Sequence, residues 1–320
     1  KVKEIIIENE KAIGVIVENF KGEEEKIFAN KEVIICSGSF ITPKILMLSG
    51  IGNQEELENL SIKCIKHLPG VGKNLMDHPE CPLIASANGK YGYYKQGEGW
   101  RMLKNGIEFL LFGSGKVNST GVEAGAFVNP INKDDLSYIQ AFFVPSIYMN
   151  SDTIGVIDDG YGMSITTVMT KPKSRGYVKL KSSNFKDNPE IELNLLKHND
   201  DLKMMMAGQR FFLQALTNGP LSKKVKKIIV PNTENLNDEN LEKHCRRFVR
   251  TNYHPSGTAK MGADNDKMSV LDSKLRVRGI ENLRVCDLSA MPNINSGNTS
   301  APAMMLGLRC GDFLSETNAN

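Results

Sequence analysis

The stretch Glu32-Val-Ile-Ile-Cys-Ser-Gly-Ser-Phe-Ile-Thr-Pro43-Lys-Ile-Leu-Met-Leu-Ser-Gly50-Ile-Gly52 predicts the fold class. Its first five residues are nearly all apolar, as in a strand buried on both faces, and small residues end that strand. Pro43 is expected in the first turn of a helix, which Gly50 ends. Such a strand, turn and helix can bring backbone N–H groups close to a ligand, although a plain tight turn fits equally well.

The rest of the chain supports a mixed α/β (α+β) protein. Apolar residues alternate through residues 1–36, which predicts a β-meander. Beyond residue 81, strand-like runs surround a predicted helix over residues 100–112, so this part is expected to have an antiparallel sheet of its own with flanking helices. Further helices are predicted over residues 200–216, over residues 240–250 and after residue 299. These patterns divide the chain into residues 1–80, 81–250 and 251–320.

Composition excludes several classes of protein. The 320 residues carry a net charge of +3 from 40 basic and 37 acidic residues that are mixed along the chain, so nucleic-acid binding is not expected. No run of about 18 apolar residues exists that would predict a membrane span. The six cysteines lack metal-ligand spacing, so no metal site is expected. The chain begins at Lys1 in strand-like sequence, which is typical of part of a longer protein.

Two polar residues near the C-terminus are candidates for chemistry. His254 lies in the small-residue loop Thr251-Asn-Tyr-His-Pro-Ser-Gly-Thr-Ala-Lys-Met-Gly262, and its ordinary pKa of about 6.5 suits a general base, although a structural histidine fits too. Asn298 precedes the last predicted helix and either binds a substrate oxygen or caps that helix. The other histidines in charged surroundings, His67, His198 and His244, are expected to be exposed and without function.

Two aspartates and the serines complete the candidates. Asp287 ends the apolar run that starts at Leu283, and it either accepts a hydrogen bond from a ribityl or ribose hydroxyl or caps the next turn. Asp77 and His78 follow a glycine-rich loop that is interpreted as a hydrogen-bonded structural turn. A serine hydrolase is disfavoured because the chain has no G-x-S-x-G motif.

Four stretches together resemble the glucose-methanol-choline (GMC) family of flavin-dependent oxidoreductases. They are Cys36-Ser-Gly-Ser through Gly52, Pro69-Gly-Val-Gly through His78, Tyr253-His-Pro-Ser-Gly-Thr-Ala-Lys-Met-Gly262, and Arg284-Val-Cys-Asp-Leu through Asn298-Thr-Ser-Ala-Pro302. Their order and spacing span almost the whole chain. Asn298 stands where other members carry histidine, and this resembles the choline-dehydrogenase-like and aryl-alcohol-oxidase-like branches.

The resemblance implies FAD as cofactor, an alcohol as substrate, and oxygen or a quinone as electron acceptor. It implies that His254 removes the hydroxyl proton while hydride passes to flavin N5, and that Asn298 binds the substrate oxygen. The positions that it implies near FAD are Val2, Ser37, Gly38, Tyr253, Asp287, Leu288 and Thr299. Residues 1–80 then form part of a FAD-binding domain, residues 81–250 are mainly a substrate-binding domain, and residues 251–320 carry the catalytic loop back to the FAD-binding domain.

The chain departs from the family at its N-terminus. Family members begin with a strand, G-x-G-x-x-G and a helix that hold the FAD pyrophosphate, and this sequence starts after that region. The isolated chain is therefore expected to bind FAD poorly, and a separate N-terminal half is one possible partner. Two alternatives to alcohol oxidation stay open, namely a hydroxynitrile lyase on the same scaffold and an inactive fragment or a subunit that completes another chain.

Overall fold

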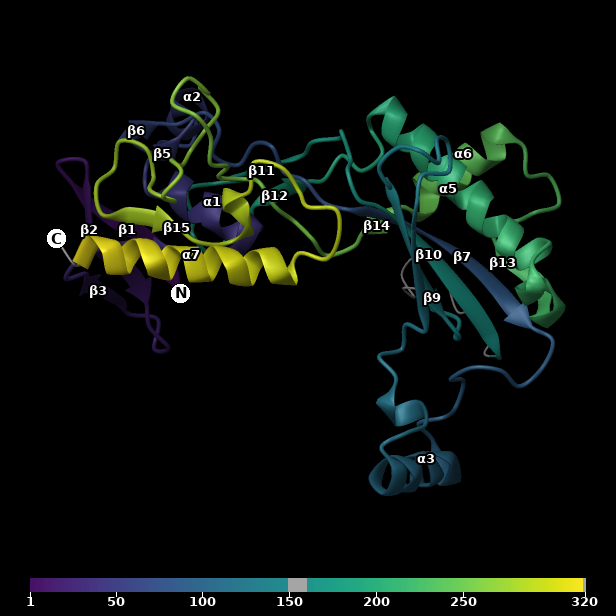
Figure 1. Cartoon of the computed structure of the whole chain (residues 1–320). Helices are drawn as coiled ribbons and strands as arrows, with labels where there is room; N and C mark the ends of the chain where they lie inside the picture. The colour runs from purple at the N-terminus through teal and green to yellow at the C-terminus, as the bar shows by residue number, and fades with distance from the viewer. Residues whose placement is uncertain (149–159, 319–320) are drawn as a thin grey trace. The chain divides into compact units, whose positions relative to one another are not determined.

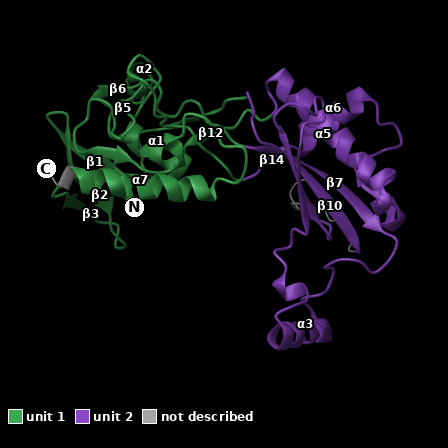
Figure 2. Cartoon of the chain, in the orientation of Figure 1, with its two compact units in different colours: residues 1–77, 174–195, 253–320 green, residues 78–173, 196–252 purple. Residues whose placement is uncertain are grey.

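A computed structural model describes residues 1–148 and 160–318 (Figure 1). The chain divides into two compact units, coloured separately in Figure 2. Unit 1 comprises residues 1–77, 174–195 and 253–320, and unit 2 comprises residues 78–173 and 196–252. Sequence patterns did not separate residues 174–195 from the second region, whereas the structure includes them in unit 1.

Unit 1 begins with an antiparallel meander, as the alternation of apolar residues predicts. Its strands are β1 (Val2–Glu8), β2 (Lys11–Glu18) and β3 (Glu24–Phe28), in the order β1-β2-β3. Asn9 and Glu10 join the first two strands, and both have a left-handed backbone with φ of 50° and 59°. Two such residues form the tight turn whose twist matches an antiparallel pair.

The strand predicted at residues 32–36 is present as β4 (Val33–Ile35), and it pairs in parallel with β15 (Leu283–Val285). The prediction that this strand is buried on both faces is wrong for its central residue, because Ile34 is 38% exposed. Its neighbours alternate in direction, so Val33 and Ile35 reach the core of unit 1 while Ile34 points away from it.

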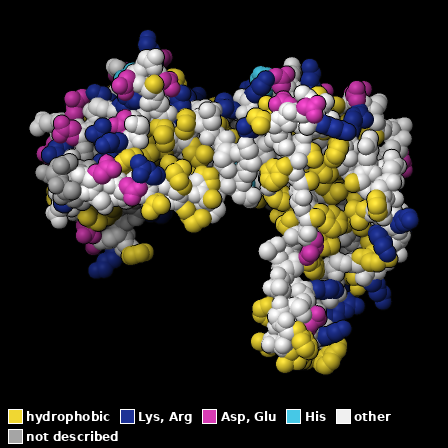
Figure 3. Space-filling model, in the orientation of Figure 1, with side chains coloured by type: hydrophobic (Ala, Val, Ile, Leu, Met, Phe, Trp, Pro, Cys, Tyr) yellow, Lys and Arg dark blue, Asp and Glu magenta, His cyan; other side chains and the backbone are white. Residues whose placement is uncertain are grey.

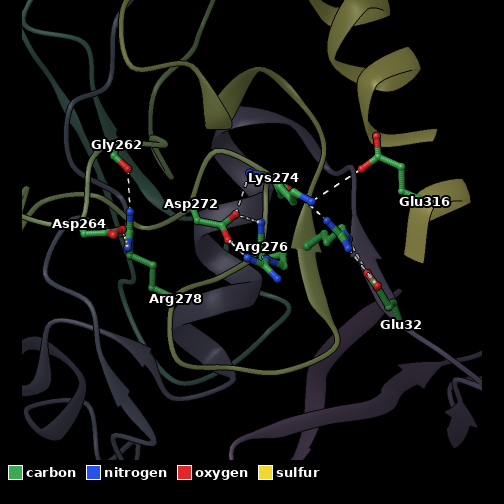
Figure 4. A network of polar contacts seen from close by, with 9 residues as sticks. Glu32, Gly262, Asp264, Asp272, Lys274, Arg276, Arg278 and Glu316 are labelled. Carbon is green, nitrogen blue, oxygen red and sulfur yellow. Dashed lines mark hydrogen bonds and ion pairs between the residues drawn. The ribbon is translucent and has the colours of Figure 1, made fainter. Parts of the chain in front are cut away.

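A buried ion pair joins β15 to Glu32, the residue directly before β4. Arg284 on β15 donates from Nε and Nη2 to the two carboxylate oxygens of Glu32, at 2.5 and 3.1 Å. Its remaining Nη1 donates to the carbonyl of Lys274 at 2.6 Å. Hydrogen bonding to Glu32 raises the pKa of the Arg284 guanidinium. Figure 4 shows Glu32 and Lys274 in the wider polar network around this pair, which includes Asp272 and Arg276.

Helix α1 (Gly38–Leu48) begins earlier than the sequence predicts, and Pro43 lies inside it instead of in its first turn. Proline lacks the N–H that bonds the preceding turn, so a helix through it needs outside partners. Hydrogen bonds from distant segments supply them, as described for the site below. Ser49 and Gly50 end the helix as expected, with Gly50 in a left-handed conformation.

Unit 2 is built on an antiparallel sheet with helices packed against it (Figure 1). Strand order is β13-β7-β10-β9-β8, with β14 also paired to β7. The strands are β7 (Pro79–Ala87), β8 (Ala124–Val128), β9 (Ile139–Val144), β10 (Gly162–Met169), β13 (Val225–Val230) and β14 (Arg250–Thr251). The prediction of an antiparallel sheet with flanking helices is confirmed.

The predicted helices are present with small shifts in their ends. They are α3 (Gly99–Phe112), α5 (Asn199–Thr217), α6 (Asp238–Phe248) and α7 (Ser300–Asn318). Gly113 ends α3 in a left-handed conformation, as its position predicts. The remaining elements are β5 (Ile51–Gly52), α2 (Gln54–Glu58), β6 (Lys66–His67), η1 (Lys116–Asn118), β11 (Tyr177–Lys179), β12 (Glu190–Glu192), η2 (Pro220–Lys224) and η3 (Leu288–Ala290). Within the described ranges, no helix is long and apolar enough to cross a membrane.

The expectation that His244 is exposed is wrong. It is buried on α6 together with Leu241 and Cys245, and Leu241 lies three residues before His244 and four before Cys245, which is helical spacing. Its Nε2 lies 3.2 Å from Oε1 of the buried Gln209. Burial lowers the pKa of His244 to about 4, so the ring is neutral near pH 7. The sequence prediction was wrong because it relied on the charged residues next to His244 and not on the apolar positions that share its side of the helix.

Candidate active site

His254 lies at the start of the loop through which the chain enters unit 1. Tyr253 before it has φ of 60°, which is unusual for a bulky residue, and Pro255 follows. The backbone N–H of His254 donates to Oδ1 of Asp77 at 3.0 Å. His254 is 8% exposed, and burial lowers the pKa of its imidazole below the ordinary 6.5. A neutral imidazole that can accept a proton is therefore its main form near pH 7.

The loop after His254 is held between two other segments of unit 1. On one side, Ser256 and Met76 exchange backbone hydrogen bonds, both at 2.9 Å. On the other, Gly257 N–H donates to the carbonyl of Leu288 at 3.0 Å, and Ala259 N–H donates to that of Ser289 at 2.9 Å. This places the predicted catalytic loop directly against η3, where the predicted cofactor position Leu288 lies.

Gly257 is needed for this arrangement. Its φ is +89°, and a Cβ at this position would lie 2.5 Å from Met76 Cε and 2.7 Å from the carbonyl oxygen of Asn74. Any side chain would clash with these neighbours. In addition, residues other than glycine rarely adopt this positive φ. The glycine thus allows the loop to pack closely against the segment that carries Asp77.

The carboxylate of Asp287 is surrounded by four donors. Its Oδ2 accepts from Gly38 N–H at 2.9 Å and from the Thr42 hydroxyl at 2.6 Å. Its Oδ1 accepts from the N–H and the hydroxyl of Ser289, at 2.8 and 2.5 Å. Of the two roles that the sequence left open, capping of the next turn is the one observed. A hydrogen bond from a cofactor hydroxyl to this side chain stays a prediction, and it would have to share these filled acceptor sites.

Asp287 also determines what the start of α1 can bind. The N-terminus of a helix favours an anion, and the carboxylate of Asp287 already occupies that position at Gly38. Gly38 has φ of +79°, and the space where a Cβ would lie is open. Ser37, whose N–H donates to the Thr42 hydroxyl at 3.2 Å, completes the turn. The anion-binding position at the start of α1 is thus filled by Asp287, whereas the space beside the Cα of Gly38 is empty of atoms from the rest of the described chain.

Asn298 and Thr299 precede α7. The backbone carbonyl of Thr299 accepts from Ala303 N–H at 3.0 Å, which is the first bond of the helix, so Thr299 and not Asn298 takes the capping position. The side chain of Asn298 is exposed, and its carbonyl accepts from Asn295 at 3.1 Å. Capping is therefore not the role of Asn298, while its convergence with His254 stays a prediction.

Among the predicted residues, the structure brings Gly38 to Asp287 and Leu288 to the loop of His254. Val2 lies at the exposed start of β1, paired with Val17. The side chain of Tyr253 is exposed.

Sequence patterns missed several residues that hold the site, and they identified Asp77 only as part of a structural turn. Asp77, Thr42, Ser289, Ser39 and Thr258 each place a hydrogen bond on one of the predicted segments. Their partners are mostly more than 170 residues away in the chain, so spacing alone could not reveal the pairs. The concentration of small hydroxyl residues around His254 and after Cys36 was the available signal.

Comparison with known proteins identifies the class to which this fold and site belong. Residues 1–80 match the N-terminal pattern of GMC oxidoreductases, and residues 172–307 match the C-terminal pattern. The chain belongs to the GMC oxidoreductase family, whose cofactor is FAD.

Particular relatives agree with this assignment. The chain is 34% identical over 313 residues to an oxygen-dependent choline dehydrogenase of Escherichia coli O139:H28, covering 97% of this chain and 55% of that protein. It is 32% identical to oxygen-dependent choline dehydrogenase 1 of Chromohalobacter salexigens, covering 96% and 54%. The structure is similar to that of formate oxidase from Aspergillus oryzae, with a TM-score of 0.88, 27% identity, and coverage of 99% and 60%. The chain thus spans little more than half the length of these relatives.

Proposed function

We propose that this chain is part of a FAD-dependent enzyme that oxidises an alcohol. The observation that carries the proposal is His254, which is buried, neutral near pH 7 and fixed through its N–H by Asp77, within a segment that matches the family pattern. A neutral imidazole can take the proton of a substrate hydroxyl, and the alkoxide character that results lets hydride leave the adjacent carbon. FAD, when bound, accepts that hydride.

The residues of this chain that would contact FAD form a consistent set. Gly38 offers open space beside its backbone, which allows a flat ligand to approach closely. Leu288 and the backbone around Asp287 lie on a segment that is hydrogen-bonded to the loop of His254, and Thr299 lies at the start of α7. These residues therefore fit an FAD that lies against unit 1, and Asn298 would hydrogen-bond the substrate oxygen.

The proposed substrate class is a primary alcohol, and choline is the first to test because two relatives are named for it. The chain, supplied with any further polypeptide that it needs to hold FAD, is mixed anaerobically with a panel of primary alcohols. Bleaching of the flavin absorbance by at least one of them is expected. A flavin that stays oxidised with every alcohol would contradict the proposal, and cyanide release from a cyanohydrin under those conditions would favour a lyase instead.

We also propose that another polypeptide segment completes the FAD site, whether it belongs to the same gene product or to a separate chain. Met304, Met305 and Leu308 on α7 are exposed, the last at 69%. Figure 3 shows hydrophobic side chains gathered on this face of unit 1. Such a surface is typical of an interaction site. Co-purification of a chain or segment that carries G-x-G-x-x-G would support this, and tight FAD binding by residues 1–320 alone would contradict it.

A further inference from the structure

Pro43 leaves one carbonyl of α1 without a partner from the helix. A residue at this position would normally donate its N–H to the carbonyl of Ser39, but proline has none. Ser39 is buried, so an unpaired carbonyl there would be costly. The hydroxyl of Thr258, which is also fully buried, donates to this carbonyl at 2.7 Å. A residue of the His254 loop thus supplies the hydrogen bond that the helix cannot make.

Ser39 holds the same loop at a second point. Its hydroxyl donates to the carbonyl of Pro255, the residue after His254, at 2.8 Å. The loop is therefore attached to one turn of α1 on both sides of Gly257. The N–H of His254 is bound separately by Asp77. Together these three hydrogen bonds fix the loop from His254 to Thr258. None of them involves the imidazole of His254.

We propose that Ser39 and Thr258 are positioning residues that dock the loop of His254 on α1 at the carbonyl that Pro43 leaves free. This inference rests on the proposed function, in which His254 is the base. The helix that carries the docking carbonyl begins at Gly38, where FAD is proposed to lie, so the pair links the base to the cofactor side of the site. A general base must lie within hydrogen-bond reach of the proton that it takes. Loosening the loop should therefore lower kcat strongly and change KM little.

The test must separate positioning from the mere satisfaction of a buried carbonyl. Thr258→Val removes the hydroxyl, and Thr258→Ser keeps it. The double variant Thr258→Val/Pro43→Ala restores an N–H that can bond the Ser39 carbonyl from within the helix, but the attachment of the loop through Thr258 stays missing. Ser39→Ala removes only the bond to Pro255 and serves as a second probe should Thr258→Val fold poorly.

Three properties are measured for each variant. They are the denaturant midpoint of unfolding, the pH titration of the His254 imidazole followed by NMR, and, for the protein with FAD bound, kcat and KM for alcohol oxidation. Thr258→Val and Ser39→Ala should shift or broaden the His254 resonance and lower kcat about tenfold or more, with little change in KM. Thr258→Ser should stay within about twofold of the parent protein on every measure.

The double variant decides the question. It should regain the unfolding midpoint that Thr258→Val loses, while the His254 titration and kcat stay impaired. Recovery of all three by the double variant, or an unchanged His254 resonance in Thr258→Val and Ser39→Ala, would overturn the proposal. The NMR titration needs no activity, so an altered His254 resonance in a protein that oxidises no alcohol would refute the proposed function and leave the positioning role standing.

Discussion

His254 and His244 are both buried, and burial lowers the pKa of both imidazoles. Their surroundings nevertheless differ. His254 lies on a loop and its N–H donates to Asp77, whereas His244 lies on α6 with its ring against Gln209 and Cys81 in the core of unit 2. A lowered pKa alone therefore does not identify a catalytic base. The loop that follows His254 is hydrogen-bonded to η3 through Gly257 and Ala259, within a segment matched by the family, and on this basis we propose His254 and not His244 as the base.

His244 should make the stability of unit 2 depend on pH. The unfolded chain binds a proton near pH 6.5, but the folded chain binds it only near pH 4. Between these values the unfolded state holds more protons, so stability falls as pH falls, by up to about 3 kcal/mol. Denaturant unfolding of the parent and of His244→Gln at pH 7 and near pH 4.5 measures this. An equal loss of stability in both proteins would contradict the assignment.

Sequence patterns predicted single residues unevenly. The small-residue context of His254 pointed to a polar site, and the family resemblance supplied its role. The same reasoning misplaced His244, because charged neighbours on the exposed face of α6 masked the apolar positions at Leu241 and Cys245. It also left open whether Asn298 caps α7, and the structure gives that position to Thr299.

At the scale of elements, the buried Arg284–Glu32 ion pair joins β15 to the residue before β4, and we expect it to stabilise this parallel pair of strands. Arg284→Met would leave a largely buried carboxylate without its partner, and the loss should be about 3–5 kcal/mol of unfolding free energy. The double variant Arg284→Met/Glu32→Leu should recover much of it, since no unpaired charge remains. Chemical denaturation measures each value.

Arg276→Met is the matched control for this prediction. Arg276 pairs with Asp272 at 2.7 Å in the same network, but its side chain is mostly exposed. Its loss should therefore cost less than about 1 kcal/mol. Equal effects of the two arginine substitutions would show that the buried pair does not hold the strands together.

The ends of elements followed from sequence where the signal was local. Gly113 ends α3 and Gly50 ends α1, both as predicted. The start of α1 was missed because its first N–H and the carbonyl freed by Pro43 are satisfied by Asp287 and Thr258. Those partners lie more than 200 residues further along the chain, so no local pattern could reveal them.

For the whole molecule, alternation and helical spacing predicted a mixed fold with an antiparallel sheet, and this is what the chain forms. The return of residues 174–195 to unit 1 was not predicted. One of the contacts that bring this segment back is the exchange of backbone hydrogen bonds between Leu75 and Gly176, at 3.1 and 2.8 Å. Any residue type except proline can make such contacts, so they leave no trace in the sequence.

The most direct test of the proposed chemistry is the rate at which an alcohol reduces the bound flavin without oxygen, compared between the parent protein, His254→Gln and His198→Gln. The exposed His198 is the matched control. His254→Gln should slow reduction by about 10²-fold or more, and His198→Gln should leave it unchanged. In the parent protein the rate should rise with pH as His254 loses its proton and then become constant. Because burial lowers the pKa of His254, the midpoint of this rise should lie below pH 6.5. Equal rates for all three proteins, or a rate that does not depend on pH, would contradict the role of His254 as the base.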